Sequence, residues 1–209
     1  MRGFELYEAL LWEPGEGYFL LERHLRRLAA SAAHFHFSFD LDAVTRGLAE
    51  LAEGLPGIPR KVRVELSANG DLFFEHVGVK PSSPVRTAVA REPIDSGDEF
   101  LRHKTSERGV YLRALAAHPE AQDVLLWNER GELTESCAAN LVLELDGRRV
   151  TPSLASNLQP GTFRAALLES GEIEEDVVPV KALERASRLF LINSVRRWCA
   201  IELLTPAAR

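Results

Sequence analysis

The sequence has few cysteines and no long apolar run. Only Cys137 and Cys199 occur among 209 residues, and neither belongs to a C-x-x-C pair or to a spacing typical of metal ligands. This pattern indicates a reducing compartment, and we predict a cytoplasmic protein. No segment approaches the roughly 20 apolar residues that a membrane helix needs, and the amino-terminal residues lack the apolar core of a signal peptide. We therefore expect no association with a membrane.

An excess of basic residues is also missing. The chain has 25 lysines and arginines against 31 aspartates and glutamates, which gives a formal net charge of -6. Binding to nucleic acid needs a concentrated basic face, so this balance argues against a nucleic-acid partner. The arginines that do cluster, Arg23, Arg26 and Arg27, lie on a mixed segment, where a solvated helix face is the usual outcome. The hydrophobic content of 45% is sufficient for a real core, in one large domain or two small lobes.

Patterns typical of metal ligands are absent as well. His34 and His36 lie close together, but no third ligand of fitting spacing follows them. We predict no metal site, and we place both histidines at the end of a helix.

The first half of the chain predicts a small sheet with helices. Pro14-Gly15-Glu16-Gly17 predicts a hairpin turn, and the helical period of the apolar residues predicts two helices, the second capped by Asp40. A turn at residues 68–71 predicts a second hairpin. The predicted elements are strands at 4–12 and 18–21, helices at 22–35 and 41–55, and strands at 61–67 and 72–79.

The second half is richer in predicted strands. Pro93, Ser96 and Gly97 make residues 91–99 the predicted linker between a small α/β lobe at 1–90 and a larger, strand-rich lobe at 100–209. The overall prediction is a mixed α/β (α+β) fold. The predicted elements are helices at 106–117 and 161–168 and strands at 123–127, 132–134, 140–145, 148–151, 188–193 and 199–203.

One carboxylate lies in unusual surroundings. Glu135 belongs to the stretch Leu133-Thr134-Glu135-Ser136-Cys137-Ala138-Ala139-Asn140-Leu141, whose other residues are mostly small or apolar. An ionised carboxylate buried without a partner costs several kcal/mol, so a buried Glu usually faces a cation, a metal or a proton donor on a ligand. Cys137 lies on the same alternating strand and is expected to pack as a small hydrophobic residue.

Lys104 is the second unusual residue. It lies between His103 and Thr105, without the acidic neighbours that solvated lysines often keep. A desolvated lysine loses proton affinity and becomes a nucleophile for carbonyls, which is the basis of Schiff-base catalysis. A lone lysine is usually a surface residue. A lysine together with a buried glutamate is what a pyridoxal cofactor needs, the amine for its aldehyde and the carboxylate for its ring nitrogen.

Such a cofactor also needs a phosphate site. Proteins build one from an arginine and from the backbone N–H groups at the start of a helix. The segment Gln159-Pro160-Gly161-Thr162-Phe163-Arg164 has this form, because Gly161 permits close approach of the backbone and the next amides start a predicted helix. An ordinary loop-to-helix junction has the same form, so this segment supports a phosphate site only in combination with Lys104 and Glu135.

The four motifs together resemble a known family. The order His24-Leu25-Arg26-Arg27-Leu28, Lys104-Thr105-Ser106-Glu107-Arg108, the stretch around Glu135, and Pro160-Gly161-Thr162-Phe163-Arg164 is similar to that of the class IV, fold-type IV pyridoxal-phosphate enzymes. These include branched-chain and D-amino-acid aminotransferases and 4-amino-4-deoxychorismate lyases. The resemblance covers nearly the whole chain. It implies a two-lobed α/β homodimer with pyridoxal 5'-phosphate (PLP) between its lobes.

The resemblance assigns roles to particular residues. It makes Lys104 the amine that binds the cofactor aldehyde and moves protons, and Glu135 the partner of the pyridine nitrogen. Arg27 would hold the phosphate, and Asn140 would support the strand of Glu135. The further cofactor contacts implied by the resemblance are Gly161, Thr162, Phe163, Asn193 and Ser194.

Within the family, the stretch Glu135-Ser136-Cys137-Ala138-Ala139-Asn140-Leu141 and the arginine four positions after the lysine are most similar to the lyases. The first hypothesis is therefore a 4-amino-4-deoxychorismate lyase of the folate pathway, which releases pyruvate and leaves 4-aminobenzoate. A class IV aminotransferase for branched-chain or D-amino acids would use the same cofactor residues, and it stays open. A catalytically inactive relative that acts as a partner protein is a third hypothesis.

The residues expected to contact the substrate differ from the pattern of the family. The arginine-bearing loop that captures a substrate carboxylate in lyases is replaced by residues 67–71. Arg108, Arg196 and Arg197 are the candidates for that contact. Tyr7 and Tyr111 could reach the substrate or the phenolic oxygen of the cofactor, although core packing is the commoner role of such residues.

Overall fold

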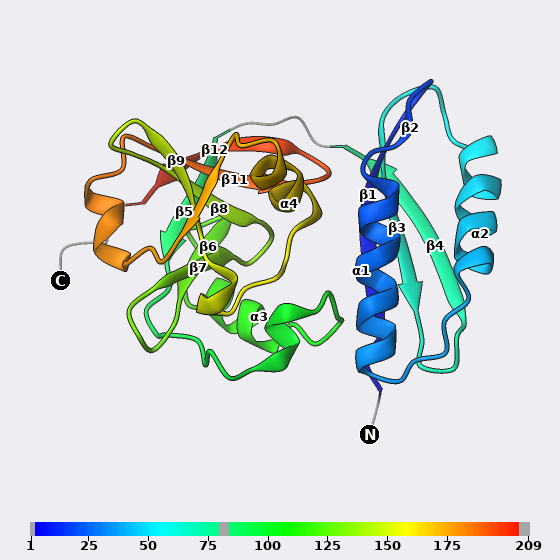
Figure 1. The fold of residues 1–209 in the computed structure, drawn as a ribbon, viewed down its shortest axis with the longest axis horizontal. Coiled ribbons are helices and arrows are strands. Elements are labelled where there is room, and N and C mark those ends of the chain that lie inside the picture. Colours follow the sequence, from blue (N-terminus) through cyan, green and yellow to red (C-terminus); the bar gives the residue numbers. More distant parts are fainter. Residues whose placement is uncertain (1–2, 80–83, 205–209) are drawn as a thin grey trace. The chain divides into compact units, whose positions relative to one another are not determined.

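The structure is a computed structural model that describes residues 3–79 and 84–204. Its contacts divide the chain into two compact units (Figure 1). The first unit comprises Met1–Pro81, His103–Glu107 and Ser194–Arg196, and the second comprises Ser82–Arg102, Arg108–Asn193 and Arg197–Arg209. Each unit is therefore assembled from separate stretches of the chain. The mixed α/β fold predicted from the sequence is confirmed.

The first unit is an antiparallel sheet with two helices, in the strand order β2-β1-β3-β4. Successive residues of a strand point to opposite faces, so one set of alternate residues can face the helices. In β1 this set includes Leu6 and Leu10, which share a core with Leu28 of α1 and Leu48 of α2. The bounds are β1 Leu6–Glu13, β2 Gly17–Tyr18, α1 Leu21–His34, α2 Leu41–Glu53, β3 Arg60–Leu66 and β4 Leu72–Gly78.

A stretch from much later in the chain completes one edge of this sheet. The Tyr7 N–H donates to the Lys104 carbonyl at 2.9 Å, and the Ser106 N–H donates to the Glu5 carbonyl at 2.8 Å. These bonds flank an isolated antiparallel bridge between Thr105 and Leu6 of β1. The predicted nucleophile therefore lies on a sheet edge.

The second unit contains a closed barrel of six strands. The order is β8-β11-β12-β5-β6-β7, and a pairing between Glu135 of β7 and Asn140 of β8 closes the circle. Two further strands extend from β8, with β9 antiparallel to it and β10 parallel to β9. The strand bounds are β5 Val85–Val89, β6 Asp123–Trp127, β7 Leu133–Ser136, β8 Asn140–Leu145, β9 Arg148–Pro152, β10 Glu174–Asp176, β11 Arg188–Asn193 and β12 Arg197–Leu203.

Strand β6 is buried on both faces. Leu125 packs in a core with Leu141 and Leu191, whereas its neighbour Val124 packs in another core with Tyr111. The second core lies under the helix α3. The helices of this unit are η1 Glu99–Arg102, α3 Gly109–Ala116, η2 Leu154–Ser156, α4 Thr162–Glu169 and η3 Val180–Glu184.

Several predicted boundaries need correction. The helix predicted from residue 106 starts only at Gly109, because the Ser106 N–H is bound to the carbonyl of Glu5, the residue before β1. The predicted strand at 18–21 ends at Tyr18, because Leu20 has a left-handed backbone (φ 56°) and α1 follows directly. Strand β12 begins two residues earlier than predicted, and the predicted list omits β5 and β10. Since β5 pairs with β6 and β12, the second unit begins before the linker expected at 91–99.

Candidate active site

Lys104 lies in the first unit beside β1. Its Nζ is 4.8 Å from the centre of the Tyr7 ring. The preceding residue, His103, is fixed on α1, because its Nδ1 lies 2.9 Å from the Ser31 hydroxyl and its ring stacks on that of His34 at 4.4 Å. The backbone on both sides of the lysine is thus attached to the first unit, which restricts the positions that the amine can reach.

A second cation, the Arg63 guanidinium, also contacts the Tyr7 ring, and this contact was not predicted from the sequence. The guanidinium carbon of Arg63, on β3, lies 4.3 Å from the centre of the same ring. Arg63 also forms an ion pair with Glu65. The alternation of charged and apolar residues in β3 was the signal available in the sequence, since it predicts one polar face of the sheet. Two positive groups therefore lie within 5 Å of the centre of the Tyr7 ring.

Arg27 is held by a buried carboxylate. Its Nε and Nη2 donate to the two oxygens of Glu8 at 2.8 and 2.7 Å, and His24 Nδ1 lies 2.7 Å from Oε2. Burial opposes ionisation of Glu8, but Arg27 and His24 outweigh it and lower the pKa of Glu8 from 4.5 to about 2. Glu8 and Tyr7 are neighbours on a strand, so their side chains point to opposite faces. The Arg27 ion pair is therefore on the α1 face of the sheet.

Ser194 also lies in the first unit. It follows β11 directly, is buried, and donates its hydroxyl to the Ala9 carbonyl of β1 at 3.3 Å. Asn193, the preceding residue, is the last of β11 and pairs with Arg197. Arg197 is exposed and has a left-handed backbone (φ 57°). The turn between β11 and β12 is thus shared by the two units.

Glu135 is buried in the second unit, as its surroundings predict, and only 5% of it is exposed. The Tyr111 hydroxyl donates to Oε1 at 2.9 Å, and the Asn140 amide donates to Oε2 at 3.3 Å. Neither donor carries a formal charge. The carboxylate is thus held by hydrogen bonds from α3 and β8, and the bond from Tyr111 was not predicted.

Asn140 joins this carboxylate to the segment before α4. Its amide also donates to the Gln159 carbonyl at 2.9 Å. A Cβ atom added to Gly161 would lie 1.9 Å from Asn140 Oδ1, so the absence of a side chain at 161 makes room for Asn140. The structure thus shows a close approach of Gly161 to Asn140, whereas the approach of Gly161 to a phosphate stays a prediction.

The helix α4 starts at Thr162, as predicted, and Gly161 is its N-cap without any side-chain cap bond. Thr162 and Phe163 are buried. Arg164 is buried as well, but its guanidinium is bound to Glu175 and to the Pro152 carbonyl. Arg164 therefore serves the packing of α4, whereas the start of the helix presents a partial positive charge.

Arg108 and Cys137 both contribute to the scaffold of this unit. The guanidinium of Arg108 lies over the Tyr111 ring, with its carbon 4.3 Å from the centre, and donates to the Cys137 carbonyl. Burial raises the pKa of the Cys137 thiol to about 12, and the charge of Asp123 adds to the rise. Cys137 is therefore a buried and protonated thiol at neutral pH, in agreement with its predicted packing.

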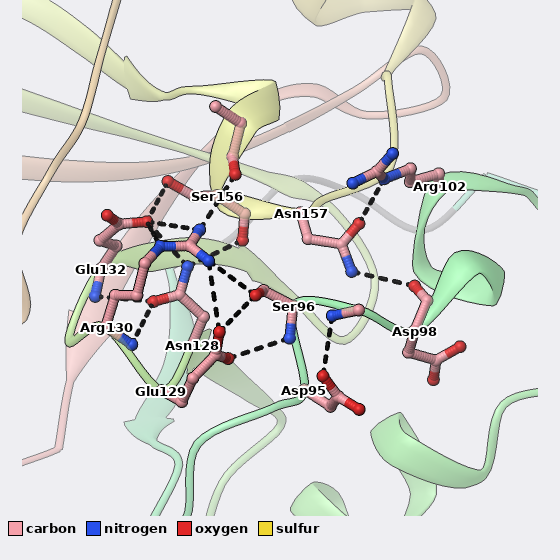
Figure 2. A network of polar contacts seen from close by, with 12 residues as sticks. Asp95, Ser96, Asp98, Arg102, Asn128, Glu129, Arg130, Glu132, Ser156 and Asn157 are labelled. Atoms are coloured by element: carbon pink, nitrogen blue, oxygen red, sulfur yellow. Dashed lines mark hydrogen bonds and ion pairs between the residues drawn. The ribbon is translucent and has the colours of Figure 1, made fainter.

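A polar network fixes the loop that leads toward α4 (Figure 2). Arg130 donates to Glu132 at 2.9 Å, to Ser96 at 2.6 Å and to the Ala155 carbonyl at 3.0 Å. Hydrogen bonds from Arg130, Asn128 and Ser156 lower the pKa of Glu132 to about 2. The turn between β6 and β7 is thereby tied to residues 155 and 156, a few positions before Gly161.

Asn157 extends this network to a third segment (Figure 2). Its Oδ1 accepts from Arg102 Nε at 2.7 Å, and its Nδ2 donates to the Asp98 carbonyl at 2.9 Å. Asn157 is buried and has a left-handed backbone (φ 66°).

In the described ranges, no helix is long and apolar enough to cross a membrane, and no group of three acidic, histidine or cysteine side chains could hold a metal ion.

Comparison with known proteins identifies relatives along the whole chain. The family described as amino-transferase class IV matches residues 5–204. A protein of Schizosaccharomyces pombe, named as a candidate aminodeoxychorismate lyase, is 32% identical over 210 residues, which cover 95% of this chain and 89% of that protein.

Solved structures agree with this match. A candidate amino-acid aminotransferase of Mesorhizobium loti is 35% identical, with a TM-score of 0.90, and the alignment covers 97% of this chain and 100% of that one. A hypothetical aminotransferase of Mycobacterium tuberculosis, in its PLP-bound form, shares the fold with a TM-score of 0.82 at 21% identity, over 97% of this chain and 82% of that one. This chain therefore belongs to the class IV aminotransferase family of fold type IV.

Proposed function

We propose that this chain binds PLP, with Lys104 for the cofactor aldehyde and Glu135 for the pyridine nitrogen. The observation that carries the proposal is the burial of the Glu135 carboxylate, which the Tyr111 hydroxyl and the Asn140 amide hold in place. A buried carboxylate is a suitable partner for a positive group on a ligand, and a protonated pyridine nitrogen is such a group. The Mycobacterium structure of the same fold is PLP-bound, which supports PLP as the cofactor.

The phosphate of PLP would meet the start of α4. The N-cap position at Gly161 has no side-chain cap, and a helix start attracts anions through its N–H groups and its dipole. Thr162 and Phe163 would supply backbone amides, with Asn193 and Ser194 as further contacts. Arg27 would add a charge, and its ion pair with Glu8 fixes two of its nitrogens.

The reaction we favour is the release of pyruvate from 4-amino-4-deoxychorismate. When bound, PLP withdraws electrons from the carbon that bears the substrate amine. Lys104 Nζ would then take the proton from that carbon, and the ring would become aromatic as 4-aminobenzoate when its C–O bond to the enolpyruvyl group breaks. The leaving enolpyruvate would take up a proton to become pyruvate. The Schizosaccharomyces relative and the similarity of the Glu135 stretch and Arg108 to lyases support this choice.

A class IV aminotransferase is the second candidate. It is supported by the Mesorhizobium structure, which is named as an amino-acid aminotransferase and matches this chain from end to end. Such an enzyme would use Lys104, Glu135 and the start of α4 in the same way. The two candidates differ in the substrate pocket, to which Tyr7, Arg108, Tyr111 or Arg197 could contribute. In either case we propose a cytoplasmic homodimer that acts on a small amine.

The cofactor proposal is tested by the visible spectrum of the purified protein. We expect the wild type to turn yellow with PLP and to bleach with borohydride, and Lys104→Ala to stay colourless after the same treatment. Lys61→Ala is a matched control, because Lys61 is an exposed lysine of β3. A wild type that takes up no PLP would instead favour a catalytically inactive partner protein.

The choice between the two reactions needs substrates. For a lyase, we expect pyruvate and 4-aminobenzoate to form from 4-amino-4-deoxychorismate in equal amounts, without any keto-acid acceptor. Formation of glutamate from 2-oxoglutarate with leucine or D-alanine, and no pyruvate from aminodeoxychorismate, would identify an aminotransferase. Sedimentation of the holoenzyme would test the homodimer.

A further inference from the structure

Tyr111 contacts the Glu135 carboxylate directly. Its hydroxyl lies 2.9 Å from Oε1, and the exposed fractions of the two residues are 6% and 5%. A phenol has a single hydrogen, and this geometry gives it to Glu135. Tyr111 therefore packs in the core, which was one of its two expected roles, and in addition it donates a hydrogen bond to Glu135.

The ring of Tyr111 is itself fixed against the end of β7, the strand that contains Glu135. The Arg108 guanidinium lies over the ring and donates to the Cys137 carbonyl, two residues after Glu135. In return, the Cys137 thiol is 3.6 Å from the Tyr111 carbonyl. The first turns of α3 and the end of β7 are thus joined at three points, which leaves the hydroxyl little freedom to move.

We propose that Tyr111 is a positioning residue that holds the Glu135 carboxylate as an anion directed at the pyridine nitrogen of PLP. This inference rests on the proposed function, since it needs that cofactor. A donor hydrogen bond stabilises the charged form of a carboxylate, and it also fixes the rotation of its side chain. Asn140 holds the other oxygen, so the carboxylate is fixed from two elements.

The consequence is a preference for a cofactor ring that can carry a proton. A fixed anion stabilises the protonated pyridine nitrogen, whereas a ring with carbon at that position offers it neither a charge nor a hydrogen bond. A hydrogen bond to a charged group is one of the stronger kinds, so its loss should reduce this preference roughly ten-fold. Binding of the phosphate and the aldehyde should change less.

The experiment compares PLP with 1-deazapyridoxal phosphate, which has a C–H group in place of the ring nitrogen. The affinity of the apoprotein for each is measured by titration, and the ratio of the two affinities is the readout. We expect the wild type to prefer PLP and Tyr111→Phe to lose most of that preference. Glu135→Gln should lose it too. Tyr18→Phe is the matched control, because Tyr18 donates its hydroxyl to the Leu48 carbonyl in the first unit.

The outcomes separate this inference from the proposed function. If the wild type binds neither compound, both fail. If the wild type binds PLP and the deaza compound equally well, or if Tyr111→Phe weakens both by the same factor, the positioning role is wrong and the PLP assignment stands.

A second measurement keeps the hydroxyl in place, in case Tyr111→Phe does not fold. With 3-fluorotyrosine at position 111, the fluorine resonance should move more on binding PLP than on binding the deaza compound. Equal shifts would overturn the role of Tyr111.

Discussion

The backbone angles of Gly161 (φ -65°, ψ 136°) are ordinary for any residue. Glycine is required at this position because the side chain of Asn140 lies against it. A Cβ atom there would lie 1.9 Å from Asn140 Oδ1. Asn140 cannot move away cheaply, because its amide is bound to both Glu135 and the Gln159 carbonyl. One missing side chain therefore preserves the contacts of the candidate active site.

We expect Gly161→Ala to displace Asn140 and to break these two hydrogen bonds. The loss should lower the free energy of unfolding by about 2 kcal/mol, since one of the bonds is to a carboxylate. The affinity for PLP should fall as well. Denaturant unfolding and a PLP titration measure the two effects.

Gly57→Ala is the control for this change. No atom lies within 4 Å of a Cβ added there, and its backbone is not left-handed. A Gly161→Ala protein as stable as Gly57→Ala would show that Asn140 can shift without cost, and would contradict this account.

The residues of the candidate site differ in how far the sequence could predict them. Small and apolar neighbours were enough to predict that Glu135 is buried. The hydroxyl that binds it comes from Tyr111, 24 residues earlier, and no local pattern records such a contact. The same holds for Glu8 and Arg27, which are 19 residues apart. Contacts between distant residues are decided by the fold, which local periodicity does not determine.

At the scale of elements, the Glu8 carboxylate joins β1 to α1. Its partners Arg27 and His24 both belong to α1, and Glu8 itself is only 2% exposed. Removing one partner of a buried ion pair is costly, because the other charge stays buried. This ion pair is therefore a major attachment of the helix to the sheet.

The lowered pKa of Glu8 predicts how stability depends on pH. The pKa falls from 4.5 to about 2 on folding, so the ionised carboxylate stabilises the folded protein fully above about pH 4.5. That stabilisation, about 3 kcal/mol, should be lost as the pH falls toward 2. We expect Glu8→Gln to lower stability at neutral pH, and its difference from the wild type to shrink over this range.

Denaturant unfolding at a series of pH values measures this difference. Glu50→Gln, at an exposed position of α2, serves as the control. A difference between the wild type and Glu8→Gln that stays constant from pH 5 to pH 2 would show that the ion pair is not the source.

The elements that were predicted well are those with their own local signals. Helix α2 begins where Asp40 predicts it, and the Asp40 side chain accepts from the Ala43 N–H at 3.1 Å. Strand β10 has three exposed residues and is a strand only because it pairs with β9. The start of α3 was predicted too early because Ser106 is held by Glu5. Where pairing with a distant segment decides the structure, the local pattern is insufficient.

At the scale of the whole molecule, the chain passes repeatedly between its two units. It enters the first unit at His103–Glu107 and again at Ser194–Arg196. The first of these stretches supplies partners to the edge of β1, with the Ser106 N–H 2.8 Å from the Glu5 carbonyl. A fragment that ends before this stretch would leave that edge without these partners.

We expect a fragment of residues 3–79 to self-associate, because an unpaired strand edge is a template for pairing with another chain. A peptide of residues 101–108 should suppress this association, because it restores the bonds to Glu5 and Tyr7. Sedimentation velocity of the fragment, with and without the peptide, measures the effect.

The control is the same peptide with Ser106→Pro. Proline has no N–H to donate, so this peptide cannot form the bond to the Glu5 carbonyl and should protect poorly. A fragment that stays monomeric and unfolds cooperatively without any peptide would show that the first unit folds without its later segments. The sheet would then fold without residues 103–107, and contacts elsewhere in the chain would determine the position of Lys104.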